Sequence, residues 1–389
     1  MMKANRMSNN ARPLRRWFGT ALALALGTVF ATTLAANIAM AEDLPDWAAT
    51  LNDGGKVRVA VAPPDDPHFS HLSWCKAVRA NDGTIVLGYI AGIFHGSHGG
   101  GSPSVSISTD DGKTFTPPNV LRVFDKTKDY SCSGNLALGV AEDGAIVLLA
   151  MAYTGDERNH IFGWRSTDSG RTWSEVDTST LGPNKTGSVF GNILNIPGRG
   201  LSVLGHYRAG SSPHTKGIWI ASSTDNGRTW GEPTKIFDEA TVEPMMVRSG
   251  DRLIALFRKL GKSDFQYVSV SDDGGKSWKT EPSELKIEKP GFSLAAPCAA
   301  VHPEKPNQLV VLTTERGKPG RIWLWKADAD KLNWKRERQV LEYPRPDGDK
   351  HNDFGYPWLV HLKGDRWLMF YYHGLGRGPN SIWVAEVTL

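Results

Sequence analysis

Short runs of apolar residues recur along the chain from about residue 57 onward, each bounded by glycine, aspartate, asparagine or proline. Runs of this length between turn-forming residues are typical of buried β-strands, and no long stretch with a 3.6-residue period suggests an amphipathic helix. The pattern therefore predicts an all-β protein. The clearest predicted strands are residues 57–61, 84–89, 145–150, 253–257, 309–312 and 367–372.

An eight-residue pattern, Ser-x-Asp-x-Gly-x-(Ser/Thr)-(Trp/Phe), occurs four times between these runs. Its copies start at residues 108, 166, 223 and 271, which are 58, 57 and 48 positions apart. Aspartate can accept hydrogen bonds from the backbone that follows it, and glycine can adopt a positive φ, so each copy predicts a tight turn anchored by its aromatic residue. Each turn offers too few carboxylates for a calcium site, so we interpret the repeat as structural and expect no metal.

The spacing of the repeats predicts the architecture, because a period of about 50 residues is typical of solenoids and propellers. Four units carry the pattern, and residues 327–334 resemble a degraded fifth copy. A sixth unit spans about 351–389, and the early strand 57–61 is available to complete it. We therefore expect a six-bladed β-propeller of four-stranded antiparallel blades, formed by a single domain over residues 42–389.

The N-terminal segment is expected to be removed. Five basic residues accompany an apolar stretch at residues 17–39, and Ala39-Met40-Ala41 has the form of a signal-peptidase site. Arg15 and Arg16 resemble a twin-arginine export signal. Residues 1–41 are thus predicted to be a signal peptide of a periplasmic or secreted bacterial protein, with no membrane span after cleavage.

Charge and cysteine content narrow the choice of partners. The net charge is +4 for the whole chain, but it is about −1 once residues 1–41 are set aside. No polybasic run remains, so we expect no nucleic-acid partner. Cys75, Cys132 and Cys298 are too few for a disulfide framework, although one pair could oxidise after export. We expect a monomer without a cofactor.

Three arginines follow predicted strands at comparable places. Arg208, Arg258 and Arg316 lie 7, 5 and 7 residues after the first apolar residue of their strands, and these odd offsets place them on one face. Guanidinium groups that converge on a propeller axis repel one another unless an anion binds between them. An acidic ligand is therefore expected, although each arginine could instead pair with a local carboxylate such as Glu315.

Glu243 and Tyr356 form the second group of candidates. Each precedes a proline at the start of a predicted inner strand, so both side chains are expected at the mouth of the axis. A tyrosine beside a carboxylate can lose its proton to that carboxylate and become a nucleophile. Alternatively, Tyr356 is a packed aromatic residue and Glu243 is a partner for an arginine.

At these residues the chain resembles the sialidases (neuraminidases), in which the repeat is called an Asp-box or BNR repeat. Residues 243–258 are similar to the family segment whose glutamate assists the nucleophile and whose last arginine binds the substrate carboxylate. Residues 355–372 are similar to the segment with the nucleophilic tyrosine. The resemblance implies a retaining exo-glycoside hydrolase that acts on sialic acid or another acidic sugar of a glycoconjugate. It assigns roles to Tyr356 as nucleophile, Glu243 as its base, and Arg258 with Arg316, or Arg321, as the carboxylate clamp.

Two family features are missing from the first blade. The segment where the family has its first arginine reads SWCKAV at residues 73–78, so Lys76 or Arg208 would have to supply that charge. The loop at residues 92–101, where the family's acid/base aspartate is expected, contains no carboxylate. His95 or His98 could act as general acid near neutral pH, or Asp156 and Glu157 could reach in from the next blade.

These departures keep two other functions open. A polysaccharide lyase on the same fold would use a tyrosine or histidine to remove the C5 proton of a uronate whose carboxylate is neutralised by arginine. Histidines near predicted blade-end loops would suit that chemistry, namely His71, His95, His98, His206, His351 and His373. A non-catalytic propeller that binds glycans would explain the missing residues equally well.

Overall fold

The computed structural model describes residues 44–96, 99–155, 158–287 and 290–389, and residues 45–389 form one compact unit. The predicted signal peptide, residues 1–41, lies outside the described residues, as do His98, Asp156 and Glu157. In the part of the chain that is described, no helix is long and apolar enough to cross a membrane.

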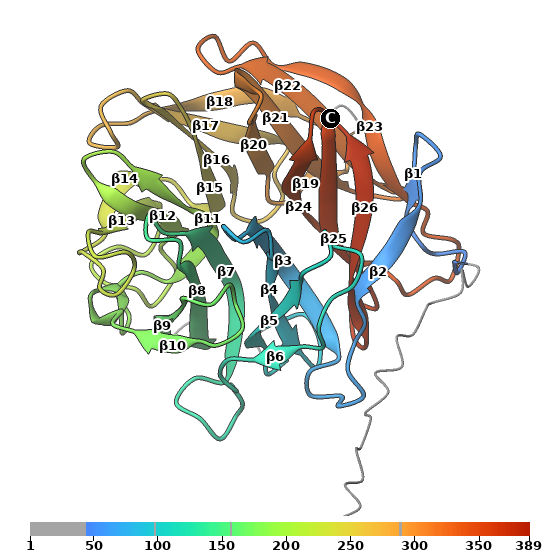
Figure 1. Ribbon diagram of the computed structural model, residues 1–389, viewed down its shortest axis with the longest axis horizontal. Helices are drawn as coiled ribbons and strands as arrows, with labels where there is room; N and C mark the ends of the chain where they lie inside the picture. Colours follow the sequence, from blue (N-terminus) through green and yellow to red (C-terminus); the bar gives the residue numbers. More distant parts are fainter. Residues whose placement is uncertain (1–43, 97–98, 156–157, 288–289) are drawn as a thin grey trace, which may run out of the picture. The chain divides into compact units, whose positions relative to one another are not determined.

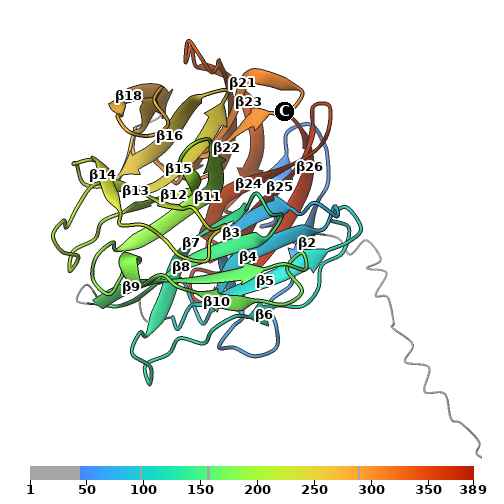
Figure 2. The ribbon, with the colours of Figure 1, turned by 60° about the vertical axis from the view of Figure 1, so that its left-hand side comes forward.

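The regular secondary structure of the described residues is almost entirely β-strand, which confirms the predicted all-β class. The helical element among them is the short 3-10 turn η1 (Ser179–Leu181). Most strands pair antiparallel with the strand that precedes or follows them in the chain (Figures 1 and 2). The apolar runs seen in the sequence form the central strands of these antiparallel groups, where both faces are covered.

The antiparallel runs follow the order of the chain. The first two are β3 (His71–Arg79), β4 (Ile85–Gly92), β5 (Ser102–Ser108), β6 (Asn119–Val120), and β7 (Cys132–Val140), β8 (Ile146–Thr154), β9 (Arg158–Ser166), β10 (Ser174–Val176). The next two are β11 (Ser188–Ile196), β12 (Gly200–His206), β13 (Ile218–Ser223), β14 (Thr234–Phe237), and β15 (Thr241–Ser249), β16 (Arg252–Lys259), β17 (Phe265–Ser271), β18 (Lys279–Lys286). The last two are β20 (Cys298–His302), β21 (Lys305–Arg316), β22 (Gly320–Asp328), β23 (Lys335–Tyr343), and β24 (Asp353–Lys363), β25 (Arg366–Gly374), β26 (Asn380–Thr388), β2 (Val57–Val61).

Parallel contacts join some runs into larger sheets. β7 pairs with β11 and β26 pairs with β3, so that two sheets have eight strands each. The short strands β1 (Thr50–Leu51) and β19 (Ser293–Leu294) extend the run that begins at β20 to a six-stranded sheet. β2 pairs antiparallel with β26, with Val57 opposite Ala385, which confirms that the early strand completes the last run.

The repeated eight-residue pattern forms the turn between the third and fourth strands of its run. In the copy at residues 166–173, the Ser166 hydroxyl donates to Asp168 (2.7 Å), and the Thr172 backbone N–H donates to the same carboxylate (2.8 Å). Gly170 has a φ of +87°, and the Trp173 indole donates to its carbonyl oxygen (2.9 Å). The repeat is therefore the anchored tight turn that the sequence predicts.

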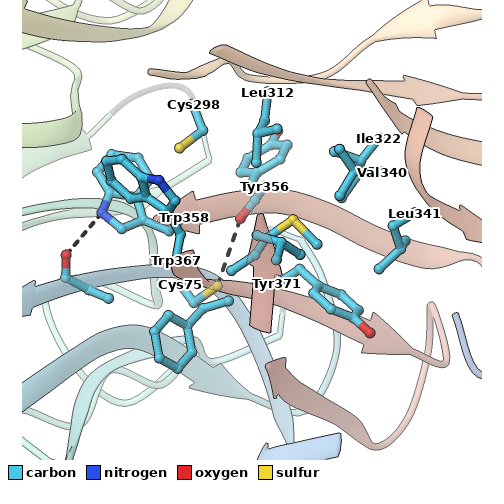
Figure 3. Packing of buried hydrophobic residues seen from close by; sticks show 14 of the residues in the cluster. Cys75, Cys298, Leu312, Ile322, Val340, Leu341, Tyr356, Trp358, Trp367 and Tyr371 are labelled. Atoms are coloured by element: carbon cyan, nitrogen blue, oxygen red, sulfur yellow. Dashed lines mark hydrogen bonds between the residues drawn. The ribbon is translucent and has the colours of Figure 1, made fainter. Parts of the chain in front are cut away.

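The largest cluster of buried apolar side chains draws many of its members from all strands of the last two runs, β20 to β23 and β24 to β26, together with residues of β3 (Figure 3). Cys75 and Cys298 belong to this cluster, and Trp358 fixes its indole by donating to the Ala77 carbonyl oxygen (3.0 Å). All three cysteines are buried free thiols. This close-packed core holds the strands that carry the candidate site.

A β-bulge interrupts the first strand of five runs at a comparable place. Pro244 and Pro357 lie in two of these bulges, where a residue without an N–H costs no ladder hydrogen bond. The residue before each proline has a positive φ, +59° for Glu243 and +32° for Tyr356, and Trp74 in β3 has +53°. Such backbone is uncommon outside glycine, and bulges redirect the side chains they carry. The bulges lie between Ser73 and Lys76, Ser133 and Leu136, Phe190 and Ile193, Val242 and Met245, and Gly355 and Trp358.

Candidate active site

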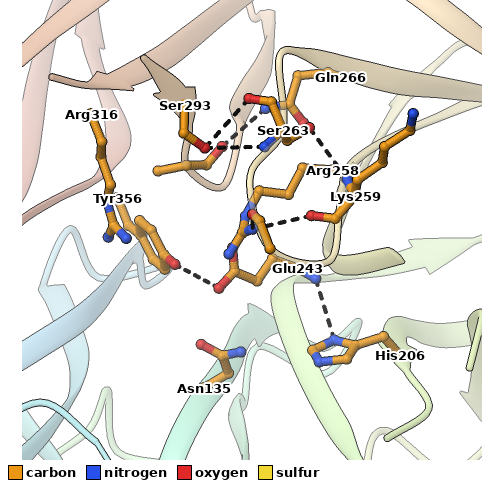
Figure 4. A network of polar contacts seen from close by, with 12 residues as sticks. Asn135, His206, Glu243, Arg258, Lys259, Ser263, Gln266, Ser293, Arg316 and Tyr356 are labelled. Atoms are coloured by element: carbon orange, nitrogen blue, oxygen red, sulfur yellow. Dashed lines mark hydrogen bonds and ion pairs between the residues drawn. The ribbon is translucent and has the colours of Figure 1, made fainter. Parts of the chain in front are cut away.

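Tyr356 and Glu243 meet through a direct hydrogen bond, although 113 positions separate them in the chain. The Tyr356 hydroxyl donates to Glu243 Oε1 at 2.6 Å. Both residues come from bulges, Tyr356 in β24 and Glu243 in β15, and their exposed fractions are 3% and 6%. Figure 4 shows the two side chains pointing toward one another from strands of two different sheets. The structure thus brings together the two residues that sequence reasoning singled out as a catalytic pair.

Arg258, near the end of β16, holds the other oxygen of the same carboxylate. Its Nε donates to Glu243 Oε2 at 2.7 Å, and one Nη donates to the Gly261 carbonyl oxygen at 3.0 Å. Burial alone would raise the pKa of Glu243, but the charge and hydrogen bond of Arg258, the Tyr356 hydroxyl and the charge of Arg316 outweigh it, so this pKa lies below its usual value. Glu243 is therefore ionised, and its Oε1 atom accepts the hydrogen bond of the tyrosine hydroxyl.

Arg316 covers the other side of the tyrosine. It is the last residue of β21, and its guanidinium carbon lies 5.3 Å from the centre of the Tyr356 ring. Its Nη2 donates to the Tyr372 hydroxyl at 3.1 Å. Burial and the Glu243 charge raise the pKa of Tyr356 to about 12, against the opposing effect of the two arginines. Tyr356 is consequently a neutral phenol at neutral pH, with its hydroxyl directed at a base.

A second polar cluster adjoins this pair. The Asp353 Oδ2 atom lies 2.9 Å from His71 Nε2 and 3.1 Å from His95 Nδ1. The His95 ring centre is 4.1 Å from that of Trp74 and 6.3 Å from that of Tyr372. Burial would raise the pKa of Asp353, but the hydrogen bonds and charges of the two histidines hold it well below its usual value. His95, one of the two predicted acids, therefore lies beside the residues that surround Tyr356.

Two further predicted residues, Arg208 and Arg321, lie away from the contacts that surround Tyr356. Arg208 follows the end of β12 and stacks its guanidinium 5.2 Å from the Tyr153 ring centre. Arg321 lies on β22, the third strand of its run, with its Nε 3.5 Å from Glu342, and no contact brings it to Tyr356. The reason is that a propeller's ligand-facing loops belong to the first two strands of each run, and sequence alone left the strand of Arg321 open.

Lys76 lies beneath the bulge of β3 and is fully buried. Its ammonium group donates to the carbonyl oxygen of Cys75 (3.2 Å) and lies 4.0 Å from the Phe190 ring centre and 4.8 Å from that of Trp358. Burial lowers its pKa to about 8, although the charge of Glu243 partly offsets this. Lys76 would therefore attract a bound anion through long-range electrostatics rather than by direct contact.

Sequence reasoning missed several residues of the site. Asp353 and Tyr372 were hidden because they belong to strands whose apolar runs dominate the pattern. Trp74 and Asn135 occupy the bulges of β3 and β7; Trp74 is the first residue of its bulge, as Glu243 and Tyr356 are of theirs, and Asn135 is the second of its own. Figure 4 shows Asn135 facing the same region as Glu243, and its Nδ2 lies 3.5 Å from the Ser188 hydroxyl. An alignment of the first strands on their bulges would have revealed both.

A cavity of about 500 Å³ opens at the other ends of the same strands. Its walls include Arg79, Asn192, Arg248 and Trp358. None of the residues proposed for catalysis lines it. We place the candidate active site at the Tyr356 end, because the base, the phenol and two arginines meet there.

Potential metal ligands meet once among the described residues, at His71, His95 and Asp353. Both imidazoles approach the same carboxylate oxygen at hydrogen-bond distance. Ligands of a metal ion instead surround a common point that none of them occupies. The geometry therefore fits a hydrogen-bonded cluster centred on Asp353.

Comparison with known proteins places the chain in a family. The family profile described as BNR repeat-like domain matches residues 122–369. No curated protein matches the sequence. The NanB sialidase of Streptococcus pneumoniae aligns in structure with a TM-score of 0.64 at 12% identity, over 86% of this chain and 71% of that one.

Two further solved structures align with this chain over almost their whole length. A protein of unknown function from Dyadobacter fermentans aligns with a TM-score of 0.62 at 21% identity, over 86% of this chain and 99% of that one. An α-L-arabinofuranosidase from Fusarium graminearum gives 0.60 at 15% identity, over 86% and 98%. At these identities the likeness concerns the fold, whereas the match to the family profile spans most of the chain. The chain therefore belongs to the BNR repeat-like domain family, and it shares its fold with sialidases.

Proposed function

We propose that this protein is an exported glycoside hydrolase that removes a terminal acidic sugar, sialic acid or a related one, from a glycan or glycoconjugate with retention of configuration. The observation that carries the proposal is the short hydrogen bond from Tyr356 to Glu243, with Arg258 and Arg316 on either side. A carboxylate next to the anomeric carbon would repel an aspartate or glutamate nucleophile, whereas a neutral tyrosine can approach it.

In the first step the Tyr356 oxygen attacks the anomeric carbon and its proton passes to Glu243 Oε1. The bond from the anomeric carbon to the leaving oxygen breaks with its electron pair, and that oxygen takes a proton from His95. Arg258 and Arg316 hold the sugar carboxylate by charge-assisted hydrogen bonds and fix the anomeric carbon in line with the tyrosine. A covalent glycosyl-tyrosine results.

In the second step water attacks the same carbon while His95 takes one of its protons. The tyrosine oxygen leaves with the electron pair of the bond to the sugar and recovers its proton from Glu243. Two inversions give net retention. Tyr356, Glu243 and His95 thus return to their starting protonation states, so no co-reactant besides water is needed.

We also propose that the six antiparallel runs are the four-stranded blades of one closed propeller, because each run has the same strand order and five share a bulge in the first strand. On this proposal residues 42–389 are a single monomeric domain, and residues 1–41 are removed on export to the periplasm or the medium. N-terminal sequencing of the exported protein and light scattering after size-exclusion chromatography test these two points.

A lyase that acts on uronate-containing glycans is the second candidate. His95 and Tyr356 lie near the same arginine, Arg316, which would neutralise a uronate carboxylate while one of them removes the C5 proton. Lyase products absorb near 235 nm, whereas hydrolysis leaves no double bond. A third possibility, a propeller that only binds glycans, predicts retained binding without turnover.

Product release from a panel of fluorogenic acidic glycosides and natural acidic glycans tests the proposal. Proton NMR of the first product gives its anomeric configuration. Retained configuration, no absorbance at 235 nm and loss of turnover in Tyr356→Phe would support it. Turnover that survives both Tyr356→Phe and Glu243→Gln would refute the proposed nucleophile and base.

A further inference from the structure

The carboxylate of Asp353 accepts hydrogen bonds from two strands, β3 and β26, and from the loop that follows β4. Its Oδ2 accepts from His71 Nε2 at 2.9 Å and from His95 Nδ1 at 3.1 Å, and the Asn380 side-chain amide donates to it at 3.1 Å. Asp353 begins β24, three residues before Tyr356. A buried carboxylate therefore stands next to the site, although the loop at residues 92–101 contains none.

The hydrogen bonds of His71 define where its protons are. Its Nδ1 lies 2.8 Å from the Gly378 carbonyl oxygen, which can only accept, so Nδ1 carries a proton. Its Nε2 faces the Asp353 carboxylate, which also accepts, so Nε2 carries a second proton. His71, whose side chain is 1% exposed, is therefore an imidazolium paired with Asp353. This pairing keeps Asp353 ionised.

Matching donors to acceptors in the same way defines the tautomer of His95. Its Nδ1 donates to Asp353, so the neutral ring carries its proton on Nδ1, and Nε2 is the nitrogen that holds the second proton when the ring is an imidazolium. The face of the ring packs on Trp74, and 28% of the side chain is exposed, against 12% for Asp353. Because the Nδ1 edge points at a buried carboxylate, the opposite edge with Nε2 is the one that a ligand can reach.

We propose that Asp353, paired with His71, positions His95 so that its Nε2 atom is the general acid and base of this site, in place of the carboxylic acid that the first-blade loop lacks. His95 enters the first step as the imidazolium and gives its Nε2 proton to the leaving oxygen, and the neutral Nδ1–H ring that results takes a proton from water in the second step. The inference rests on the proposed function for its chemistry, but the proton arrangement is a property of the resting protein. Asp353 and His71 are positioning residues, and His95 alone touches the leaving oxygen.

Substrates with different leaving groups can distinguish the proposed positioning role of Asp353 from a purely structural one. A natural sugar alcohol needs a proton from His95 to leave, whereas an activated aryl alcohol does not, and general acid catalysis supplies about 10²- to 10⁴-fold. Asp353→Asn should therefore lower kcat for a natural glycan by about 100-fold or more, but by less than about 10-fold for an activated aryl glycoside. Azide, which attacks without a base, should restore turnover of the aryl substrate in His95→Ala.

Asp365→Asn is a matched control, because Asp365, in the turn between β24 and β25, makes a similar contact with His302 at 2.9 Å. It should change neither substrate's kcat. Equal losses for both substrates in Asp353→Asn, or the same pattern in Asp365→Asn, would overturn the proposal.

Nitrogen NMR of the full-length protein labelled in histidine provides a test that does not need activity. The expected spectrum has an imidazolium at His71, assigned by its loss in His71→Gln, and His95 in its neutral form is the Nδ1–H tautomer, which changes in Asp353→Asn. A neutral His95 with its single proton on Nε2 would overturn the inference, as would shifts of both signals when Zn²⁺ is added to chelator-treated protein. If the arrangement is found but no acidic glycoside is cleaved, the proposed function fails and the positioning stands.

Discussion

Replacing Glu243 by glutamine removes the charge at the centre of the candidate site with little change in shape. The carboxylate accepts from Tyr356 at 2.6 Å and from Arg258 at 2.7 Å, and the side chains of Glu243 and Arg258 are only 8% and 13% exposed. Glutamine has one acceptor oxygen and an amide that would face the donor of one partner. The substitution therefore leaves a buried guanidinium without its counter-ion.

The expected cost follows from that geometry. Breaking a buried ion pair by neutralising one partner destabilises a protein by about 3–5 kcal/mol. Arg258 keeps its hydrogen bond to the Gly261 carbonyl oxygen, so we expect the lower end, about 3 kcal/mol, which corresponds to a fall in Tm of about 5 °C for a domain of this size. Loss of the base should also lower kcat by about 10²- to 10⁴-fold.

Calorimetry and steady-state kinetics on the same preparations measure both effects. Glu232→Gln is a suitable control, because Glu232 pairs with Lys185 at 3.0 Å on the surface, where such pairs contribute about 0.2–1 kcal/mol. Tyr356→Phe should abolish turnover with a smaller change in Tm, since no charge is left unpaired. A Glu243→Gln protein that keeps its Tm or more than a tenth of its kcat would refute the assigned role.

Three other substitutions test separate parts of the account. Lys76→Met should raise the free energy of unfolding at pH 7 by about 2 kcal/mol, measured in urea titrations. Burial lowers the pKa of Lys76 in the folded state to about 8, so the cost of burying its charge is full below pH 8. This cost disappears as the pH rises toward about 10.5, the pKa in the unfolded chain, where the stabilities of the two proteins should converge. Asp168→Asn should lower the free energy of unfolding at pH 7 by less than about 1 kcal/mol, after allowance for solvent screening. Burial would raise the pKa of Asp168, but hydrogen bonds from Thr172 and Ser166 lower it to about 2. The difference in stability between the two proteins should therefore shrink as the pH falls from 4 to 2. Arg316→Lys should raise KM for an acidic glycoside by about 10-fold or more and leave KM for a neutral one unchanged, because lysine keeps the charge but loses the planar fork.

The strands and the repeated turns could be predicted from the sequence because they depend on local chemistry. Runs such as residues 145–150 are apolar enough to be buried on both faces, and Asp168 with Gly170 encodes a turn by itself. The pairing of the early strand with the last run was also predictable, because counting the units left one strand missing.

The bulges could not be predicted, and the rest of the site depends on them. An extra residue in a strand shifts every later side chain to the opposite face, so the period of two is lost where Trp74 and Tyr356 lie. The position of Arg208 beyond the end of β12, and that of Arg321 on a third strand, were hidden for a related reason, since strand ends are set by tertiary pairing. Asp353 gives no signal until folding brings His71 and His95 to it.

The covalent intermediate is the most direct test of the central claim. A fluorine next to the anomeric carbon slows formation and breakdown of a glycosyl-enzyme, and a fluoride leaving group restores the first step, so such an acidic glycosyl fluoride should accumulate on the nucleophile. Mass spectrometry of a tryptic digest should then show one added sugar on Tyr356 in the peptide of residues 351–363, and none in Tyr356→Phe. Time-dependent inactivation with the label on any other residue would contradict the account.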